Sequence, residues 1–322
     1  MTDGRFKASW WLRPAHAQTL WASVVRKVKL RVRTEQLELP DGDFVPLDRV
    51  GDATDGPIVV VLPGLQGDVQ SAPVRGILKA FESRGWRGVL LNYRGHLQPN
   101  RFVASYHCGK TCDLDYLVRQ LHEREPHTPI GVVGLSVGAN ICLKWLGESG
   151  QRGQSLPVAA TVMVSAPFHL GTVARKIENG FSRIYQKHLL KSLHDDVQRK
   201  MRVLDVGLGL TPDELPQLNT FVKFDERISA PINGFLNAAD YYEKTRTDTL
   251  LRHINIPTLI INARNDPLVP AHLIPRPENV SPQVTLETPR NGGHMGFITG
   301  RRPWAPRYWL DQRVPDSLAA FF

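Results

Sequence analysis

The amino-acid sequence predicts an α/β fold: a mostly parallel, doubly wound sheet with an antiparallel N-terminal hairpin and an inserted helical cap. Short apolar runs alternate with segments that have apolar residues at helical spacing, as expected of consecutive β–α–β units. An Asp–Gly pair between two strand-like segments near the start predicts a hairpin turn. Residues 167–255 interrupt the alternation, because they contain amphipathic helical patterns and no run typical of a buried strand.

The predicted hairpin comes first along the chain. Its strands are residues 34–39 and 44–50, and Pro40–Asp43 forms the turn between them. The preceding segment, Arg26–Arg33, alternates basic and apolar residues after its first position. This period of two predicts an amphipathic edge strand with one solvated basic face.

Uninterrupted apolar runs indicate the strands of the parallel part, since such strands are covered on both faces. The predicted strands are residues 57–62, 88–93, 129–133, 158–164, 258–262 and 284–287. The predicted helices between and after them are residues 73–83, 110–124, 139–146 and 307–322, with approximate ends.

The interruption divides the chain into a core, residues 1–166 and 256–322, and a helical cap, residues 167–255. Residues 173–184 and 184–201 are examples of the amphipathic patterns in the cap. A second independent domain is the alternative. The modest apolar content of this interval and its position inside the strand series favour a cap placed over the carboxyl edge of the sheet.

The pentapeptide Gly134-Leu135-Ser136-Val137-Gly138 stands where a predicted strand meets a predicted helix. In this context Gly-x-Ser-x-Gly indicates a nucleophile elbow. The turn is so tight that the residues two before and two after the serine must lack bulky side chains, and glycine meets that demand. The same pattern also occurs by chance in loops, so the prediction depends on a base, an acid and an oxyanion donor elsewhere in the chain.

A serine hydroxyl needs a neighbouring base, which is itself oriented by a carboxylate. Where this turn is used, the order along the chain is serine, acid, histidine. Asp266 follows the strand at 258–262, and His294 lies in a glycine-rich loop after the strand at 284–287. The position after the preceding strand, residues 164–167, offers no carboxylate. An ordinary Asx-turn is the alternative for the aspartate, and most of the eleven histidines should be plain surface or core residues.

Attack on a carbonyl carbon places negative charge on its oxygen, which needs preorganised donors. The first predicted donor is the backbone N–H of Val137, directly after the serine. The second is the N–H of Leu65, in the loop after the strand at 57–62, where Gly64 allows a close approach.

Composition narrows the classes of partner. The formal net charge is +9, yet no DNA- or RNA-binding motif accompanies the basic residues, so no nucleic-acid partner is expected. Attachment to an anionic membrane surface through the segment 26–33 or the cluster 301–307 is left open. The three cysteines and the absence of a secretory signal at the N-terminus predict a reducing, cytoplasmic compartment. The sequence predicts no oligomeric state.

No cofactor is expected. The chain has neither a phosphate-binding Walker loop nor a Gly-x-Gly-x-x-Gly after a strand. His96, His107, Cys108 and Cys112 match no common zinc spacing, so no metal site is expected either.

With these residues in hand, the chain resembles the α/β-hydrolase fold enzymes of the YheT-like branch, which are related to the eukaryotic ABHD lipases. The resemblance spans most of the chain. Beyond the candidate triad it rests on residues 10–20, 40–43, 92–96, 106–111 with Asp113, and 224–227. It implies hydrolysis of a carboxylic ester, with Ser136, Asp266 and His294 carried over as the catalytic triad.

Two positions depart from the family pattern. The family usually has histidine where Pro63 stands, and proline removes a backbone N–H and restricts φ, so the oxyanion loop could be held differently. The family also tends to have cysteine where His96 stands. Neither departure touches the triad, but both bear on substrate preference.

The sequence therefore predicts a serine esterase that acts on small-molecule ester or lipid substrates through an acyl-enzyme on Ser136. Apolar residues of the cap would line an acyl pocket for medium or longer chains. Acyl transfer on the same triad is an alternative. A non-catalytic protein that kept the fold and uses the cap pocket for a lipid or another ligand is a second one.

Overall fold

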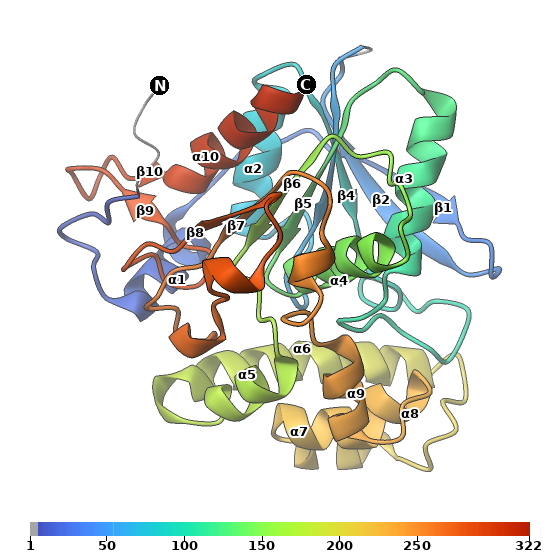
Figure 1. Cartoon of the computed structure of the whole chain (residues 1–322). Coiled ribbons are helices and arrows are strands. Elements are labelled where there is room, and N and C mark those ends of the chain that lie inside the picture. The colour runs from blue at the N-terminus through green and yellow to red at the C-terminus, as the bar shows by residue number, and fades with distance from the viewer. Residues whose placement is uncertain (1–5, 54) are drawn as a thin grey trace.

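The computed structural model describes residues 6–53 and 55–322. Residues 1–5 lie outside the described residues. They begin the N-terminal segment in which the sequence analysis predicts no secretory signal. Within the described residues, eight strands form one sheet in the order β1-β2-β4-β3-β5-β6-β7-β8 (Figure 1). The strands of this sheet are β1 (Arg33–Glu38), β2 (Phe44–Val50), β3 (Ile58–Leu62), β4 (Arg87–Leu91), β5 (Ile130–Leu135), β6 (Ala160–Val164), β7 (Thr258–Ile261) and β8 (Val284–Glu287).

The sheet has an antiparallel edge and a parallel remainder. β1 pairs with β2, and β2 with β4, in antiparallel register, whereas every pairing in the series β4-β3-β5-β6-β7-β8 is parallel. Gly42 lies in the β1–β2 turn with φ of +85°, and Leu37 faces Val45 across the ladder. The predicted mostly parallel sheet with an antiparallel N-terminal hairpin is confirmed.

Helices cover both faces of the sheet, as Figure 1 shows. α2 and α10 lie on one face, and α3 and α4 on the other. Alternate residues of a central strand point to opposite faces: Val59 and Val61 join one apolar cluster, and Val60 joins the other. All are fully buried, which explains the uninterrupted apolar runs. These helices, with α1 beside the sheet, are α1 (Ala15–Val25), α2 (Ala72–Glu82), α3 (Cys112–Arg124), α4 (Val137–Gln151) and α10 (Trp309–Leu318).

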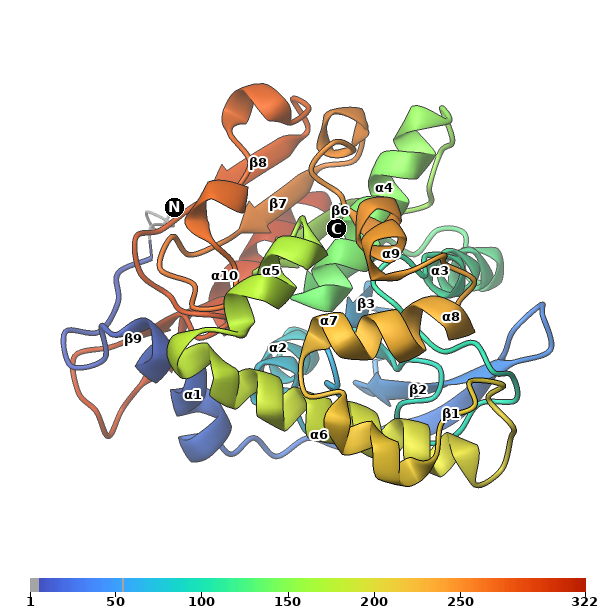
Figure 2. The same ribbon diagram turned by 90° about the horizontal axis from the view of Figure 1, so that it is seen from below.

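The segment between β6 and β7 is mostly helical, and its helices lie beyond one end of the sheet (Figure 1). Seen from below in Figure 2, α6 crosses under the molecule from the neighbourhood of α1 towards β1. Gly180, with φ of +60°, separates α5 from α6 within the predicted pattern at 173–184. The division into a core and a helical cap at residues 167–255 stays a prediction. The helices of this insertion are α5 (Leu170–Ile177), α6 (Arg183–Met201), α7 (Phe221–Phe224), α8 (Ala230–Ile232) and α9 (Ala238–Thr245), with a π-helical turn at Asp225–Ser229.

The predicted edge strand at 26–33 is wrong. Residues 26–32 belong to no helix or strand, and β1 begins only at Arg33. Their alternation has another cause: Leu30 and Val32 pack on the apolar cluster beneath them, while Lys27, Lys29 and other basic side chains are exposed. An alternation of basic and apolar residues indicates which side of a segment is buried, but a strand also needs a hydrogen-bonded partner.

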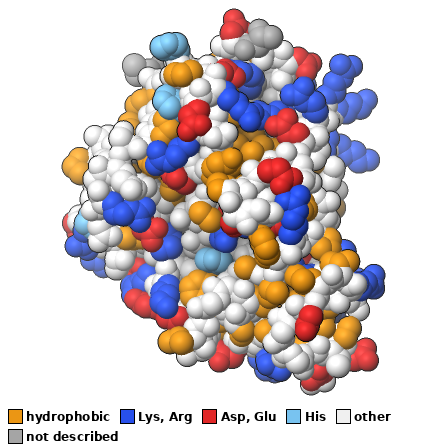
Figure 3. All heavy atoms as spheres, turned by 90° about the vertical axis from the view of Figure 1, so that its right-hand side faces the viewer, with side chains coloured by type: hydrophobic (Ala, Val, Ile, Leu, Met, Phe, Trp, Pro, Cys, Tyr) orange, Lys and Arg blue, Asp and Glu red, His pale blue; other side chains and the backbone are white. Residues whose placement is uncertain are grey.

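The sheet edge that β1 forms faces the viewer in Figure 3, where Lys and Arg side chains are interspersed with Asp and Glu. Mixed charge on an edge strand disfavours pairing with another sheet. At the other end of the chain, β9 (Ile298–Thr299) and β10 (Arg307–Tyr308) pair, so the predicted final helix begins two residues later than expected. Among the described residues, no helix has both the length and the apolar character needed to span a membrane.

Candidate active site

Ser136 lies between β5 and α4 with φ of 52° and ψ of −115°, a backbone conformation that residues other than glycine rarely adopt. A Cβ atom on Gly134 would lie 2.5 Å from the Cα of Ala139. One on Gly138 would overlap the carbonyl oxygen of Leu62. Both obstacles are backbone atoms, which cannot swing aside. The two glycines therefore allow the turn that presents the serine hydroxyl at the carboxyl end of the sheet.

The predicted base and acid lie next to this hydroxyl. His294 Nε2 is 2.9 Å from Ser136 Oγ, and His294 Nδ1 is 2.8 Å from Asp266 Oδ2. The other carboxylate oxygen, Oδ1, accepts hydrogen bonds from the N–H groups of Leu268 (2.8 Å) and Val269 (3.0 Å). Asp266 thus forms the Asx-type turn and also contacts the histidine, because each of its oxygens serves one of these contacts. Asp266 and His294 are both buried.

Helix α1 holds the loop that carries the histidine, a role that the sequence analysis did not assign. The N–H of His294 donates to Thr19 Oγ1 at 2.9 Å. The Gln18 side chain accepts from the N–H of Ile298 (2.6 Å) and donates to the carbonyl oxygens of Leu12 and Ile298. Leu12, Gln18 and Thr19 belong to the segment 10–20, which carries part of the family resemblance. That motif is the sequence signal that could have indicated a role for this segment.

The predicted oxyanion loop, residues 63–67, passes close to the serine. A Cβ atom on Gly64 would lie 3.4 Å from Ser136 Cβ. The carbonyl oxygen of Pro63 accepts hydrogen bonds from the N–H of Gly138 (3.1 Å) and from Tyr93 Oη (2.7 Å). Pro63 therefore anchors this loop through its carbonyl oxygen. The lack of an N–H in proline does not affect these contacts.

A cavity extends from the serine into the helical insertion. Its empty volume is about 1230 Å³, including solvent at its mouth. Leu65, Ser136, Val137 and His294 contribute to its wall at the sheet. Apolar side chains of the insertion form much of the remaining wall, among them Leu170, Val173, Leu189, Leu193, Phe221 and Phe224.

Titratable side chains also line this cavity, and burial alters their protonation. It lowers the pKa of His107 to about 3, raises the pKa of Asp225 to about 6, and lowers the pKa of Lys200 to about 8. Near neutral pH the His107 imidazole is therefore uncharged, while most Asp225 carboxyls are ionised and most Lys200 amines are protonated. The wall is mostly apolar, with a few charged side chains, which also include Arg94 and Asp196.

Known proteins of similar sequence and structure agree with this architecture. A family model described as the alpha/beta hydrolase fold matches residues 57–301. YheT of Escherichia coli (strain K12) is 38% identical, over 95% of this chain and 90% of its own length. Phospholipase ABHD3 of Mus musculus is 26% identical, over 91% of this chain and 73% of its own. The solved structure of the Pyrococcus furiosus esterase Pf2001 has a TM-score of 0.58 at 16% identity, covering 91% of this chain and 93% of that one.

The family match covers most of the chain, and the identity to YheT extends over nearly all of it. Both agree with the sheet order and with the resemblance predicted from the motifs. The chain belongs to the α/β hydrolase fold family.

Proposed function

We propose that the protein is a serine hydrolase that cleaves carboxylic esters through an acyl-enzyme on Ser136. One observation carries the proposal: His294 lies within hydrogen-bond distance of the serine hydroxyl on one side and of the Asp266 carboxylate on the other. A base placed in this way activates a serine that is otherwise a weak nucleophile. The names esterase and phospholipase among similar proteins support the same class of reaction.

The reaction follows from this arrangement. His294 Nε2 takes the proton of Ser136 as its oxygen attacks the ester carbonyl carbon, while Asp266 holds Nδ1–H and stabilises the imidazolium. The N–H groups of Leu65 and Val137 hold the oxyanion. His294 then protonates the leaving alcohol, and the acyl-enzyme forms. In the second half, the histidine removes a proton from water, which attacks the acyl carbonyl and releases the acid and the free serine.

The substrate class follows from the cavity. Apolar side chains of α5, α6 and α7 line the space next to the serine, and burying each methylene of an acyl chain stabilises binding by roughly 0.8 kcal/mol. We therefore propose ester or lipid substrates with medium or longer acyl chains. Rates with a series of p-nitrophenyl esters, from acetate to palmitate, test this. Acetate as the best substrate by kcat/KM would contradict it.

The central test compares Ser136→Ala with Ser83→Ala, which changes an exposed serine at the end of α2. Ser136→Ala should abolish both ester hydrolysis and labelling by a fluorophosphonate probe, with an unchanged thermal transition. Ser83→Ala should behave as wild type. Wild-type turnover in the Ser136 variant would refute the proposal, and wild-type protein that resists the probe would favour the non-catalytic binding protein.

Acyl transfer to an alcohol is the alternative on the same residues, because the acyl-enzyme can be attacked by an alcohol in place of water. Adding ethanol or glycerol during turnover and analysing the products separates the two. Hydrolysis predicts that the free acid dominates at low alcohol concentration. Predominant ester product under those conditions would favour the transferase.

A second proposal concerns membrane surfaces and rests on the turn between β9 and β10. Trp304 is 78% exposed at this turn, and Trp10, whose Nε1 donates to the carbonyl of Arg301 (3.0 Å), is 68% exposed. Arg301 and Arg302 are exposed between them. Figures 1 and 2 place the β9–β10 hairpin beside α1, which leads into the basic segment 26–33. Exposed indoles with basic neighbours suit the interface of an anionic lipid surface. We propose a peripheral contact of this kind.

Sedimentation with lipid vesicles tests the contact. Vesicles that contain phosphatidylglycerol should bind the protein at low salt, whereas binding should weaken at high salt and with pure phosphatidylcholine. Trp304→Ala should reduce binding several-fold. Leu236→Ala, at an 85% exposed apolar residue of the insertion, is the matched control and should bind as wild type. Equal binding by the two variants would refute the proposed surface.

A further inference from the structure

The oxyanion loop contains a residue in an unfavourable backbone conformation. The N–H of Gly67 donates to the carbonyl of Gly64 at 3.0 Å, which closes a turn with Leu65 and Gln66 at its centre. Gln66 has φ of 56°. A positive φ at the third position is typical of type II turns, where glycine or asparagine normally stands. Glutamine at this position is strained, so other contacts must offset the cost.

Contacts of the Gln66 side chain supply that compensation, and they reach the helical insertion. Its Nε2 donates to Asp196 Oδ2 at 2.8 Å and to Tyr106 Oη at 3.0 Å. Its Oε1 accepts a hydrogen bond from Ser192 Oγ at 2.5 Å. Ser192 and Asp196 both lie on α6, one helical turn apart. The amide thus ties the oxyanion loop to α6.

Two stacked tyrosines hold the same loop from the side of the sheet. The rings of Tyr93 and Tyr106 lie 4.6 Å apart at an angle of 10°. Tyr93 Oη donates to the carbonyl of Pro63, and Tyr106 Oη contacts Gln66. Burial raises the pKa of both phenols above the usual value, so both stay protonated. This anchor does not depend on the insertion.

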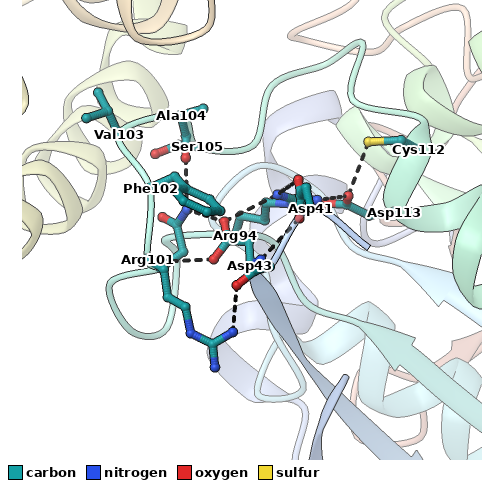
Figure 4. A network of polar contacts seen from close by, with 12 residues as sticks. Asp41, Asp43, Arg94, Arg101, Phe102, Val103, Ala104, Ser105, Cys112 and Asp113 are labelled. Atoms are coloured by element: carbon teal, nitrogen blue, oxygen red, sulfur yellow. Dashed lines mark hydrogen bonds and ion pairs between the residues drawn. The ribbon is translucent and has the colours of Figure 1, made fainter. Parts of the chain in front are cut away.

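The α6 side of the tether is itself fixed. Asp196 forms an ion pair with Arg199 and lies 3.1 Å from His96 Nδ1, and Arg199 donates to the carbonyl of His96 at 2.7 Å. One turn further, Lys200 Nζ donates to the carbonyls of residues 102–104 and to Ser105 Oγ (2.7 Å). Figure 4 shows this segment, 101–105, beside the β1–β2 turn. α6 is thereby attached to the loop that follows β4.

We propose that Gln66 is a positioning residue that transmits the placement of α6 to the oxyanion donor Leu65, its neighbour in the turn. This inference rests on the proposed function, because it assigns Leu65 N–H to the oxyanion. α6 also lines the cavity, through Leu189 and Leu193 among others. The helix that contacts the acyl chain and the loop that stabilises the transition state are therefore held in one arrangement by one side chain.

The variants Gln66→Gly and Ser192→Ala test the tether from its two ends. Glycine adopts positive φ without strain, so Gln66→Gly keeps the turn and removes only the side chain. Because an oxyanion contact acts in the transition state, Gln66→Gly should lower kcat by about tenfold to a hundredfold and change KM little. Ser192→Ala leaves the contact between Gln66 and Asp196 in place and should lower kcat by less. Both effects are smaller than the loss of about 10² to 10³ for deletion of a donor, since the N–H remains. The affinity for an alkyl boronic acid, which imitates the tetrahedral intermediate, should fall in parallel.

Asp195→Ala is the matched control, because Asp195 is exposed on α6 between the two anchors, and it should match wild type. The double variant of Gln66 and Ser192 should be no slower than the slower single variant, since both changes break one tether. A kcat within twofold of wild type in both single variants would overturn the inference, as would full additivity. Wild-type protein without Ser136-dependent turnover would instead refute the proposed function itself.

Discussion

Two buried ionic networks lie at the carboxyl edge of the sheet, and they differ in where they end. In the first, Asp266 contacts His294, and His294 contacts Ser136, whose hydroxyl lines the cavity. The last group of this network is a hydroxyl with room for a substrate beside it. The buried Asp266 carboxylate therefore acts, through His294, on a hydroxyl that can react.

The second network joins its carboxylates to one cation, Arg94, which also contributes to the cavity wall. Arg94 donates to both carboxylate oxygens of Asp113 (2.8 and 2.5 Å) and to Asp41 (2.6 Å) and Asp43 (3.3 Å), as Figure 4 shows. Asp43 in turn accepts from Asn100 at 2.6 Å. This network ties the β1–β2 turn, the loop after β4 and the start of α3 together. Both networks contain buried carboxylates, but the group that the second presents to the cavity is a guanidinium, whose pKa the neighbouring carboxylates raise. The comparison teaches that reactivity depends on a nucleophile that faces free space beside a base.

The largest expected effect breaks the first network at its acid. Asp266→Asn should lower kcat for a p-nitrophenyl ester by about 10⁴, the loss seen when the acid of a comparable triad is replaced by its amide. The amide oxygen can still accept from Leu268 N–H, so the thermal transition should move little. A loss below tenfold would show that another acid orients His294.

The next effect breaks the second network. Arg94→Met leaves Asp113 and Asp43 buried without their cation, which should lower the free energy of unfolding by about 3–5 kcal/mol. Urea denaturation measures this, and kcat per folded molecule should stay within about tenfold of wild type. Arg119→Ala, which breaks an exposed pair with Asp115, should cost at most about 1 kcal/mol. If Arg94→Met abolished turnover in fully folded protein, the second network would have a part in the chemistry.

Much of the fold was predictable from sequence because it depends on local patterns. The Asp–Gly turn indicated the hairpin, and complete burial of strands such as β3 and β5 appeared as uninterrupted apolar runs. The order of Ser136, Asp266 and His294 was also predictable, since each follows a strand at one edge. Their spacing in three dimensions is a consequence of parallel strand order.

Contacts between distant segments were not predictable. Thr19 and His294 are separated by 275 residues, and Gln66 and Asp196 by 130. No periodicity connects such pairs, because the contact exists only after the helices have packed. The failed strand at 26–33 has the same origin, since alternation says nothing of a pairing partner. The cytoplasmic compartment and the cap boundaries stay predictions.

A further buried carboxylate sharpens the comparison, because Asp225 lines the cavity without a cationic partner among the described residues. It accepts a hydrogen bond from Tyr242 Oη at 2.7 Å. Burial raises its pKa from 3.8 to about 6. The folded protein therefore holds this proton to higher pH than the unfolded chain does. The stabilising contribution is complete below about pH 4 and is lost as the pH rises through about 6.

Asp225→Asn removes this pH-dependent loss while keeping an acceptor for Tyr242. The free energy of unfolding of the variant, minus that of wild type, should increase between pH 4 and 6 and stay constant above. Urea denaturation across this range measures the difference. Asp240→Asn is the control of opposite sign, because the Lys244 ammonium lowers the pKa of that exposed carboxyl; its difference should decrease as the pH rises towards about 4 and stay flat between pH 4 and 6. If the Asp225 difference were flat with pH, burial without a cation would not raise the pKa of this carboxyl.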